Sequence, residues 1–327
     1  MTRLLLGLTI LCLMLAATSL TVGPAQISVS ESLTALFQDD QGPLSMVMRE
    51  IRLPRTILAF IVGSGLGLAG AAMQGYLRNP LAEPGLIGVS ASAALGAVIA
   101  IQTGISVSYA FGLPLMALLG AVIGVFLVML LAGSRGNSIT LILAGIAISA
   151  LAAAFTSLAL NLSPNPYAVN EIIFWMMGSL ADRSMAHVGI SLPFVIAGAI
   201  MILAIAKGLD ALTLGEDAAS ALGINLTQLR LLLVLGTASI VGAITAVAGA
   251  ISFVGLVVPH ILRPLVGAKP SRLLWASALG GGAMVLAADI AVRVILPTED
   301  LKLGVITALL GAPLFLHLIY KTRKQSL

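Results

Sequence analysis

The chain is built from long apolar runs separated by short polar connections. A membrane-spanning helix needs about 20 mainly apolar residues, and runs of this kind predict about ten spans. They cover residues 4–23, 54–76, 86–106, 110–133, 137–161, 188–207, 227–249, 252–266, 274–296 and 303–320. The run at 252–266 is short and contains Pro259 and Pro264, so we expect a bent or partial span there. The pattern predicts an all-α membrane protein.

Composition narrows the class of protein further. Of the 327 residues, 59% are apolar or aromatic and only 9% are charged, whereas a soluble domain carries about 25% charged residues. Soluble enzymes, disulfide scaffolds, disordered proteins and nucleic-acid binders are therefore excluded. The polar stretches 24–50, 162–187 and 208–226 are each too short for a soluble domain, so residues 1–327 are predicted to form one membrane domain. Within 162–187, the short apolar stretch from Ile172 to Leu180 predicts a surface helix.

Residues 1–23 allow two interpretations. An arginine, an apolar stretch and small residues are also typical of a signal peptide. The apolar stretch from Leu4 to Val22 is longer than the usual signal core, and we therefore expect a retained helix.

The positions of basic residues predict the orientation in the membrane. If the chain crosses the membrane ten times and both of its termini are cytoplasmic, the inner connections carry eleven Lys and Arg residues and the outer connections carry six. Cytoplasmic loops are enriched in Lys and Arg, so both termini are predicted to be cytoplasmic. The basic residues that give the net charge of +4 are scattered through short connections, and they therefore indicate orientation in the membrane and not nucleic-acid binding.

Two polar motifs flank the second span, one at its start and one at its end. Arg52-Leu53-Pro54-Arg55 lies at its outer mouth, where two arginines oppose the positive end of a helix dipole. Either they contact lipid headgroups, or they form an exposed guanidinium pair for carboxylates of a partner. Residues 76–90 contain two prolines and two glycines and form either a plain turn or irregular backbone beside a cavity.

The inner connection around 214–223 predicts a short helix outside the bilayer. Glu216 and Asp217 suit its first turn, and Gly223 is suited to end it. This helix is either a connector or a surface for a partner protein.

Ionisable residues near or within the spans offer a rival function. Asp289 and Arg293 are four residues apart and form either an internal ion pair or part of a proton pathway. The second possibility would make the chain an ion-coupled secondary transporter that uses Asp289.

His260 and Arg263 lie at the inner end of an apolar run, and since no His pair has zinc spacing we expect no metal site.

Glycine positions add two expectations. Gly63 and Gly67 form a small-residue face for helix packing. They do not form a nucleotide loop, and no Gly-x-x-x-x-Gly-Lys-Ser/Thr sequence is present, so the chain has no P-loop ATPase of its own.

Together the motifs resemble the membrane-permease family of ABC importers for iron-siderophores, haem and vitamin B12. The resemblance covers nearly the whole chain and is carried by motifs in order: Arg52 to Arg55, Gln74 with Arg78 to Ala82, Gly88 to Ser90, Trp175 to Gly178, Leu214 to Glu216 with Leu222-Gly223, Phe253 to Arg263, Leu286 to Arg293, and Gly304 to Pro313.

The resemblance implies ten helices per subunit and a homodimer in the inner membrane with the translocation path at the dimer interface. It implies two cytoplasmic ATPase subunits, which bind the ATP and magnesium, and a periplasmic substrate-binding protein; this chain itself is expected to hold no cofactor. The substrate is expected to be a ferric siderophore or haem first and cobalamin second.

The resemblance also assigns roles to residues by position. Arg52, Arg55 and Arg293 correspond to the arginines that meet the binding protein. The residues that correspond to the coupling helix are Glu216, Asp217, Ala218, Ala219, Leu222 and Gly223. Candidates for the translocation path or for structural turns are Gln74, Asn79, Pro80, Gly88, Ser90, Trp175, Met177, Pro259 and His260.

Overall fold

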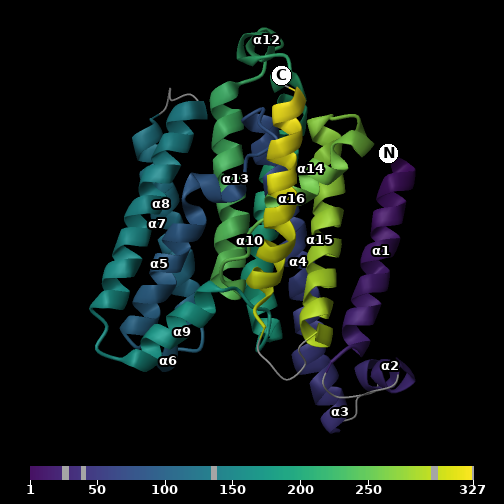
Figure 1. Cartoon of the computed structure of the whole chain (residues 1–327), viewed down its shortest axis with the longest axis vertical. Helices are drawn as coiled ribbons and strands as arrows, with labels where there is room; N and C mark the ends of the chain where they lie inside the picture. The colour runs from purple at the N-terminus through teal and green to yellow at the C-terminus, as the bar shows by residue number, and fades with distance from the viewer. Residues whose placement is uncertain (24–28, 38–41, 134–137, 296–300, 326–327) are drawn as a thin grey trace.

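The computed structural model describes residues 1–23, 29–37, 42–133, 138–295 and 301–325. Every regular element in these ranges is a helix (Figure 1). The elements are α1 (Thr2–Thr21), α2 (Val29–Phe37), α3 (Pro43–Met46), the π-helix η1 (Val47–Arg52), α4 (Leu53–Tyr76), the 3-10 helix η2 (Pro84–Ile87), α5 (Val89–Gln102), α6 (Ile105–Ser108), α7 (Gly112–Ala132), α8 (Ser138–Asn161), α9 (Pro166–Met176), α10 (Met185–Ala204), α11 (Ala206–Leu212), α12 (Glu216–Ala221), α13 (Leu226–Ala248), α14 (Val254–Leu262), the 3-10 helix η3 (Pro264–Val266), α15 (Pro270–Ile295) and α16 (Leu303–Gln325).

The predicted all-α membrane architecture is confirmed. Within the described ranges, seven helical stretches are long and apolar enough to cross a membrane, namely α1, the continuous helix from α3 to α4, α7, α8, α10, α13 and α15. Shorter apolar helices occur at Val89–Gln102 and Leu303–Leu316. The helix within 252–266 is short, as expected, because α14 ends at Leu262 and gives way to η3. The predicted ends at 137 and 296 lie outside the described residues.

Several predicted boundaries are wrong, and two of them have a clear local cause. The helix expected from residue 86 begins only at Val89, since the 3-10 turn η2 and Gly88, with φ of 76°, precede it. The surface helix expected at 172–180 is α9, which begins at Pro166 because Asn165 caps it and Pro166 suits the first turn. Gly178, with φ of 72°, follows its end.

The helices form a bundle whose two ends are distinct. α12 and the C-terminus lie at one end, and α2, α3, α6 and α9 lie at the other (Figure 1). The N-terminus of α1 points toward the α12 end. We refer below to the α12 end and the α9 end of the bundle.

The central contact joins α4 and α15 along faces of small residues. A Cβ added at Gly63 would meet the carbonyl of Gly281, and one added at Gly67 would meet the carbonyl of Ser277. The two backbones are therefore in direct contact, which is the way that small residues bring membrane helices together. The predicted packing face at Gly63 and Gly67 is confirmed.

Gly67→Ala tests this contact. The added methyl group has no space against the Ser277 carbonyl, so the substitution is expected to cost about 1–3 kcal/mol and to lower the thermal unfolding midpoint in detergent. Gly7→Ala on α1, where an added Cβ meets nothing within 4 Å, is the matched control and should be neutral or slightly stabilising. Equal stability of the two variants would contradict the direct backbone contact.

Candidate functional site

At the α9 end, three arginines and one aspartate form what we call the arginine cluster: Arg52, Arg55, Arg293 and Asp289. Asp289 on α15 is fully buried, and Arg55 of α4 donates from Nε to its Oδ1 over 2.8 Å. The Arg293 guanidinium lies 2.8 Å from Oδ2, an ion pair without hydrogen-bond geometry. The expected internal pair of Asp289 and Arg293 is confirmed, and Arg55 joins it from a distant part of the sequence.

The C-terminus of α1 completes the arginine cluster. Arg52 donates to the carbonyls of Leu20 and Thr21 over 2.9 and 3.1 Å. Arg293 donates to the carbonyls of Ser19 and Val22, each over 2.8 Å. These carbonyls at the helix end have no partners in the next turn and carry the negative end of the helix dipole. They therefore offset part of the positive charge of Arg52 and Arg293.

This geometry corrects the expectation of an exposed guanidinium pair. Arg52 is only 3% exposed, so it neither reaches lipid headgroups nor faces a partner in this structure. The Arg55 side chain keeps 17% exposure and is the more accessible of the two. Their docking role is not tested by these contacts.

The same geometry weighs against a proton pathway through Asp289. Each of its oxygens faces a guanidinium nitrogen at 2.8 Å, and the side chain is fully buried. Both oxygens are therefore engaged in the ion pairs that hold α15 to α4, and neither is open to a pathway.

At the α12 end, the predicted short helix is present. α12 runs from Glu216 to Ala221 between Gly215, with φ of 108°, and Gly223, with φ of 84°. Ala219 is buried against the bundle, whereas Glu216, Asp217 and Leu222 are exposed. Ala218 is half-buried on the same helix. The expected placement of Gly223 after the helix end is confirmed.

Gln74 joins α4 to α14 through buried polar contacts. Its Nε2 donates to the Leu256 carbonyl over 3.1 Å, and its Oε1 accepts from Arg263 over 2.7 Å. Pro259 is buried on α14, and His260 beside it is half-buried. These residues hold two helices together and do not line the groove described below.

Residues 77–88 form an irregular connection between α4 and α5. Asn79 accepts through Oδ1 from the Leu81 amide over 2.9 Å and is exposed, as is Pro80. Gly88 is buried and accepts from the Ser92 amide and hydroxyl, while Ser90 is half-buried. Burial raises the pKa of the Glu83 carboxyl in this connection, and the backbone amide of Phe253 lowers it in part.

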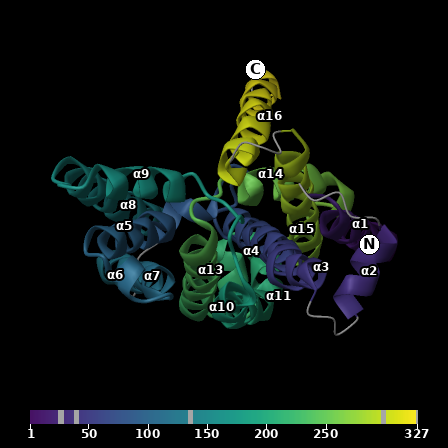
Figure 2. The same cartoon turned by 90° about the horizontal axis from the view of Figure 1, so that it is seen from below.

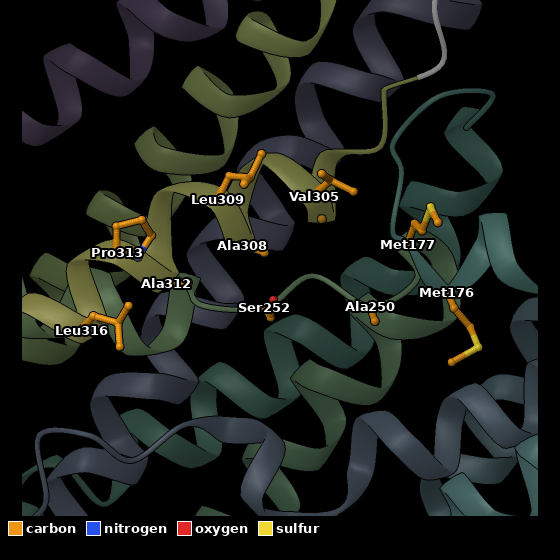
Figure 3. A pocket seen from close by; sticks show the side chains of 11 residues that line it. Met176, Met177, Ala250, Ser252, Val305, Ala308, Leu309, Ala312, Pro313 and Leu316 are labelled. Carbon is orange, nitrogen blue, oxygen red and sulfur yellow. The ribbon is translucent and has the colours of Figure 1, made fainter. Parts of the chain in front are cut away.

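An apolar groove of about 620 Å³ lies between the end of α9, the segment after α13, and α16 (Figure 3). Its lining residues are Met176, Met177, Ala250, Ser252, Gly304, Val305, Ala308, Leu309, Ala312, Pro313 and Leu316. Among the candidates for the translocation path, Met177 is the one in this lining. Trp175 is buried behind it, where its carbonyl lies against Gly249.

Sequence reasoning from the residues gave no role to the α16 side of the groove. The available signal was the spacing of Gly304, Ala308 and Ala312 at intervals of four, which places small residues on one helix face. Among the described residues, no three His, Cys, Asp or Glu side chains gather as metal ligands would.

Comparison with known proteins agrees with this architecture. The chain matches the FecCD transport family over residues 9–321. The chain belongs to this family. The hemin transport system permease protein HmuU of Yersinia pestis is 36% identical, covering 99% of this chain and 97% of that protein. The vitamin B12 import system permease protein BtuC of Klebsiella pneumoniae is 37% identical, covering 98% of this chain and 94% of that protein.

A solved structure gives the same result. An inward-facing conformation of a metal-chelate type ABC transporter superposes with a TM-score of 0.88 at 34% identity, covering 98% of this chain and 100% of that one. This FecCD family member is therefore a multi-pass membrane permease of the ABC importer class.

Asp289→Asn tests the arginine cluster. The variant keeps the shape of the side chain but leaves Arg55 and Arg293 without a buried counter-charge, and it is expected to cost about 3 kcal/mol. Thermal unfolding in detergent measures the loss.

Asp182→Asn is the matched control for that substitution. Asp182 is exposed and has φ of 57°, a conformation that Asn adopts readily, so no loss of stability is expected. A similar unfolding midpoint for both variants would show that Asp289 is not the electrostatic centre of the cluster.

Proposed function

We propose that this chain is the permease subunit of an importer that carries an iron chelate, either a ferric siderophore or haem, across the inner membrane. Cobalamin is the second candidate. The observation that carries the proposal is the whole-chain similarity in fold and sequence to a metal-chelate type ABC transporter. The relatives named for hemin and vitamin B12 support the same class of bulky metal complexes.

A second copy of the chain is the proposed other wall of the translocation path. α16 projects from the bundle, and α8 and α9 extend on the other side of the groove (Figure 2). Large apolar side chains on α8 and α16 are exposed, among them Leu143, Leu309 and Leu316. Pairing of two copies over this face would enclose the groove, as closed homodimers do.

The groove lining suits a substrate that has to be released. Apolar side chains and few polar groups surround it, so a chelate is held without many directional hydrogen bonds. Specificity is then left to the periplasmic binding protein, and identifying the ligand of that protein would decide between the iron complexes and cobalamin.

Energy is proposed to come from two ABC ATPase subunits at the cytoplasmic side. The chain has no P-loop sequence, so ATP and magnesium are assigned to these partners and this chain is not an enzyme. The exposed Glu216, Asp217 and Leu222 on α12 are the proposed contact with the ATPase. Movement of α12 with its neighbouring helices as a rigid body would switch the path between its two openings. This assignment places α12 and both termini in the cytoplasm.

Leu222→Arg tests the ATPase contact. Leu222 is 64% exposed, and a charged side chain there is expected to abolish retention of the ATPase during purification of the tagged complex. Leu162→Arg, at an equally exposed leucine of 69% near the opposite end, is the matched control and should retain the ATPase. Undiminished retention with Leu222→Arg would argue against coupling through α12.

The arginine cluster is the proposed docking point for the periplasmic binding protein. The Arg55 side chain keeps 17% exposure while its Nε donates to Asp289, and arginine binds carboxylates with a pre-organised fork. Arg52 and Arg293 support this point by joining it to α1.

Arg55→Met tests docking. The variant leaves Asp289 paired with Arg293 and removes the accessible charge, so affinity for the binding protein is expected to fall at least about tenfold, with a matching loss of binding-protein-stimulated ATP hydrolysis. Arg183→Met, in the connection before α10, is the control and should keep the stimulation. Normal stimulation with Arg55→Met would remove Arg55 from the docking surface.

A further inference from the structure

Asp210 on α11 joins the segment before α12 to the first turn of α15. Its Oδ1 accepts from the Ser271 amide over 2.8 Å, and its Oδ2 lies 3.3 Å from the Lys269 ammonium group. The amides of the first turn of a helix have no partners within the helix, so Asp210 acts as a cap supplied from another element. A carboxylate is also favourable at this positive end of the helix dipole.

The connection from Asp210 to α12 is short and continuously hydrogen-bonded. The Asp210 carbonyl accepts from the Thr213 amide and, over 2.7 Å, from its hydroxyl. The amides of Leu214 and Gly215 bond back into α11, and the Ala219 amide bonds to the Gly215 carbonyl. With Ala219 buried, these turns tie α11 and α12 into one hydrogen-bonded segment.

α15 extends from this cap to the arginine cluster. Its 26 residues make a rod about 39 Å long at 1.5 Å per residue. Gly281 and Ser277 fix it against the backbone of α4, and Asp289 and Arg293 hold its far end to α4 and α1. At the near end, Gly75 of α4 lies against both Leu209 of α11 and Pro270 of α15.

We propose that Asp210 is a positioning residue that transmits displacement of the α11–α12 segment to α15, and through α15 to the arginine cluster. This inference rests on the proposed coupling of α12 to an ATPase and deepens it. The salt bridge to Lys269 is half-exposed and contributes little, as surface ion pairs generally do. The bond to the Ser271 amide is the connection that matters.

The test compares movement at the two ends of α15 in the complete complex with its ATPase. Cys12 is the single cysteine of the chain, so Cys12→Ser gives a background for one spin label per subunit. Leu214→Cys reports on the α11–α12 segment and Val294→Cys on the far end of α15; both side chains are well exposed. The distance between the two copies of each label is measured with and without ATP.

With Asp210→Ala, the ATP-dependent change between the Leu214→Cys labels should persist, while the change between the Val294→Cys labels should be lost. The ratio of binding-protein-stimulated to basal ATP hydrolysis should fall at least about fivefold, the lower range of ordinary coupling between sites. Lys269→Gln keeps the bond to Ser271 and is the matched control, with a change of about twofold. Asp210→Asn keeps an oxygen for the Ser271 amide, and should show a smaller loss at the far label.

Two results would overturn the inference. If both label pairs respond to ATP in Asp210→Ala as they do without the substitution, Asp210 transmits nothing and the proposed function still stands. If ATP moves neither pair in the unsubstituted complex, or the ATPase does not assemble with the chain, the proposed function fails together with the inference. A merely structural role of Asp210 would lower the unfolding midpoint without separating the two label responses.

Discussion

The contact between α4 and α15 is the constraint on which the arrangement of this bundle depends. Apolar side chains gain little by leaving lipid for another helix, so membrane helices associate through close packing. One face of α4 carries Arg55, Gly63, Gly67, Gly70 and Gln74, in steps of three, four or eight residues. Gly63 and Gly67 bring the backbones of α4 and α15 together, whereas Gly70 lies against Gly255 of α14. The same face of α4 places Arg55 on Asp289 of α15 and Gln74 on the Leu256 carbonyl of α14. If α4 shifted along its axis relative to α14 and α15, Arg55 and Gln74 would both lose these partners.

The arginine cluster is a balance of charges that no single helix supplies. Arg55 and Arg293 pair with Asp289. Arg52 and Arg293 donate to the carbonyls at the end of α1. The negative end of the α1 dipole thus offsets positive charge on Arg52 and Arg293. Because α4 continues a helix that begins at Pro43, Arg52 and Arg55 lie well beyond its first turn, unlike in the arrangement expected from the sequence. These contacts consequently join the C-terminal ends of α1 and α15 to the start of α4.

The sequence predicted features that depend on nearby residues. Apolar runs located the spans, Gly63 and Gly67 indicated a packing face, and Asp289 with Arg293 indicated an ion pair one turn apart. The Arg55 contact with Asp289 joins residues separated by 234 positions, and no local pattern contains it. The same holds for the burial of Arg52, which depends on backbone carbonyls of α1, and for the cap that Asp210 gives to α15. The predicted starts of α9 and α5 differ from the observed starts at Pro166 and Val89. Local proline and glycine residues, and not the apolar run, decide where each of these helices begins.

The α16 wall of the groove contrasts with the fixed pair of α4 and α15. α16 carries Gly304, Ala308 and Ala312 toward the groove, and Gly311 packs against Phe253, whose φ of 67° is unusual for a residue with a side chain. Small side chains on this face leave the volume that a bulky chelate requires. A path between two copies changes shape most easily where helices contact few neighbours, since well-packed elements resist deformation. In the proposed importer, α4 and α15 therefore carry the displacement, and α16 is the wall that opens.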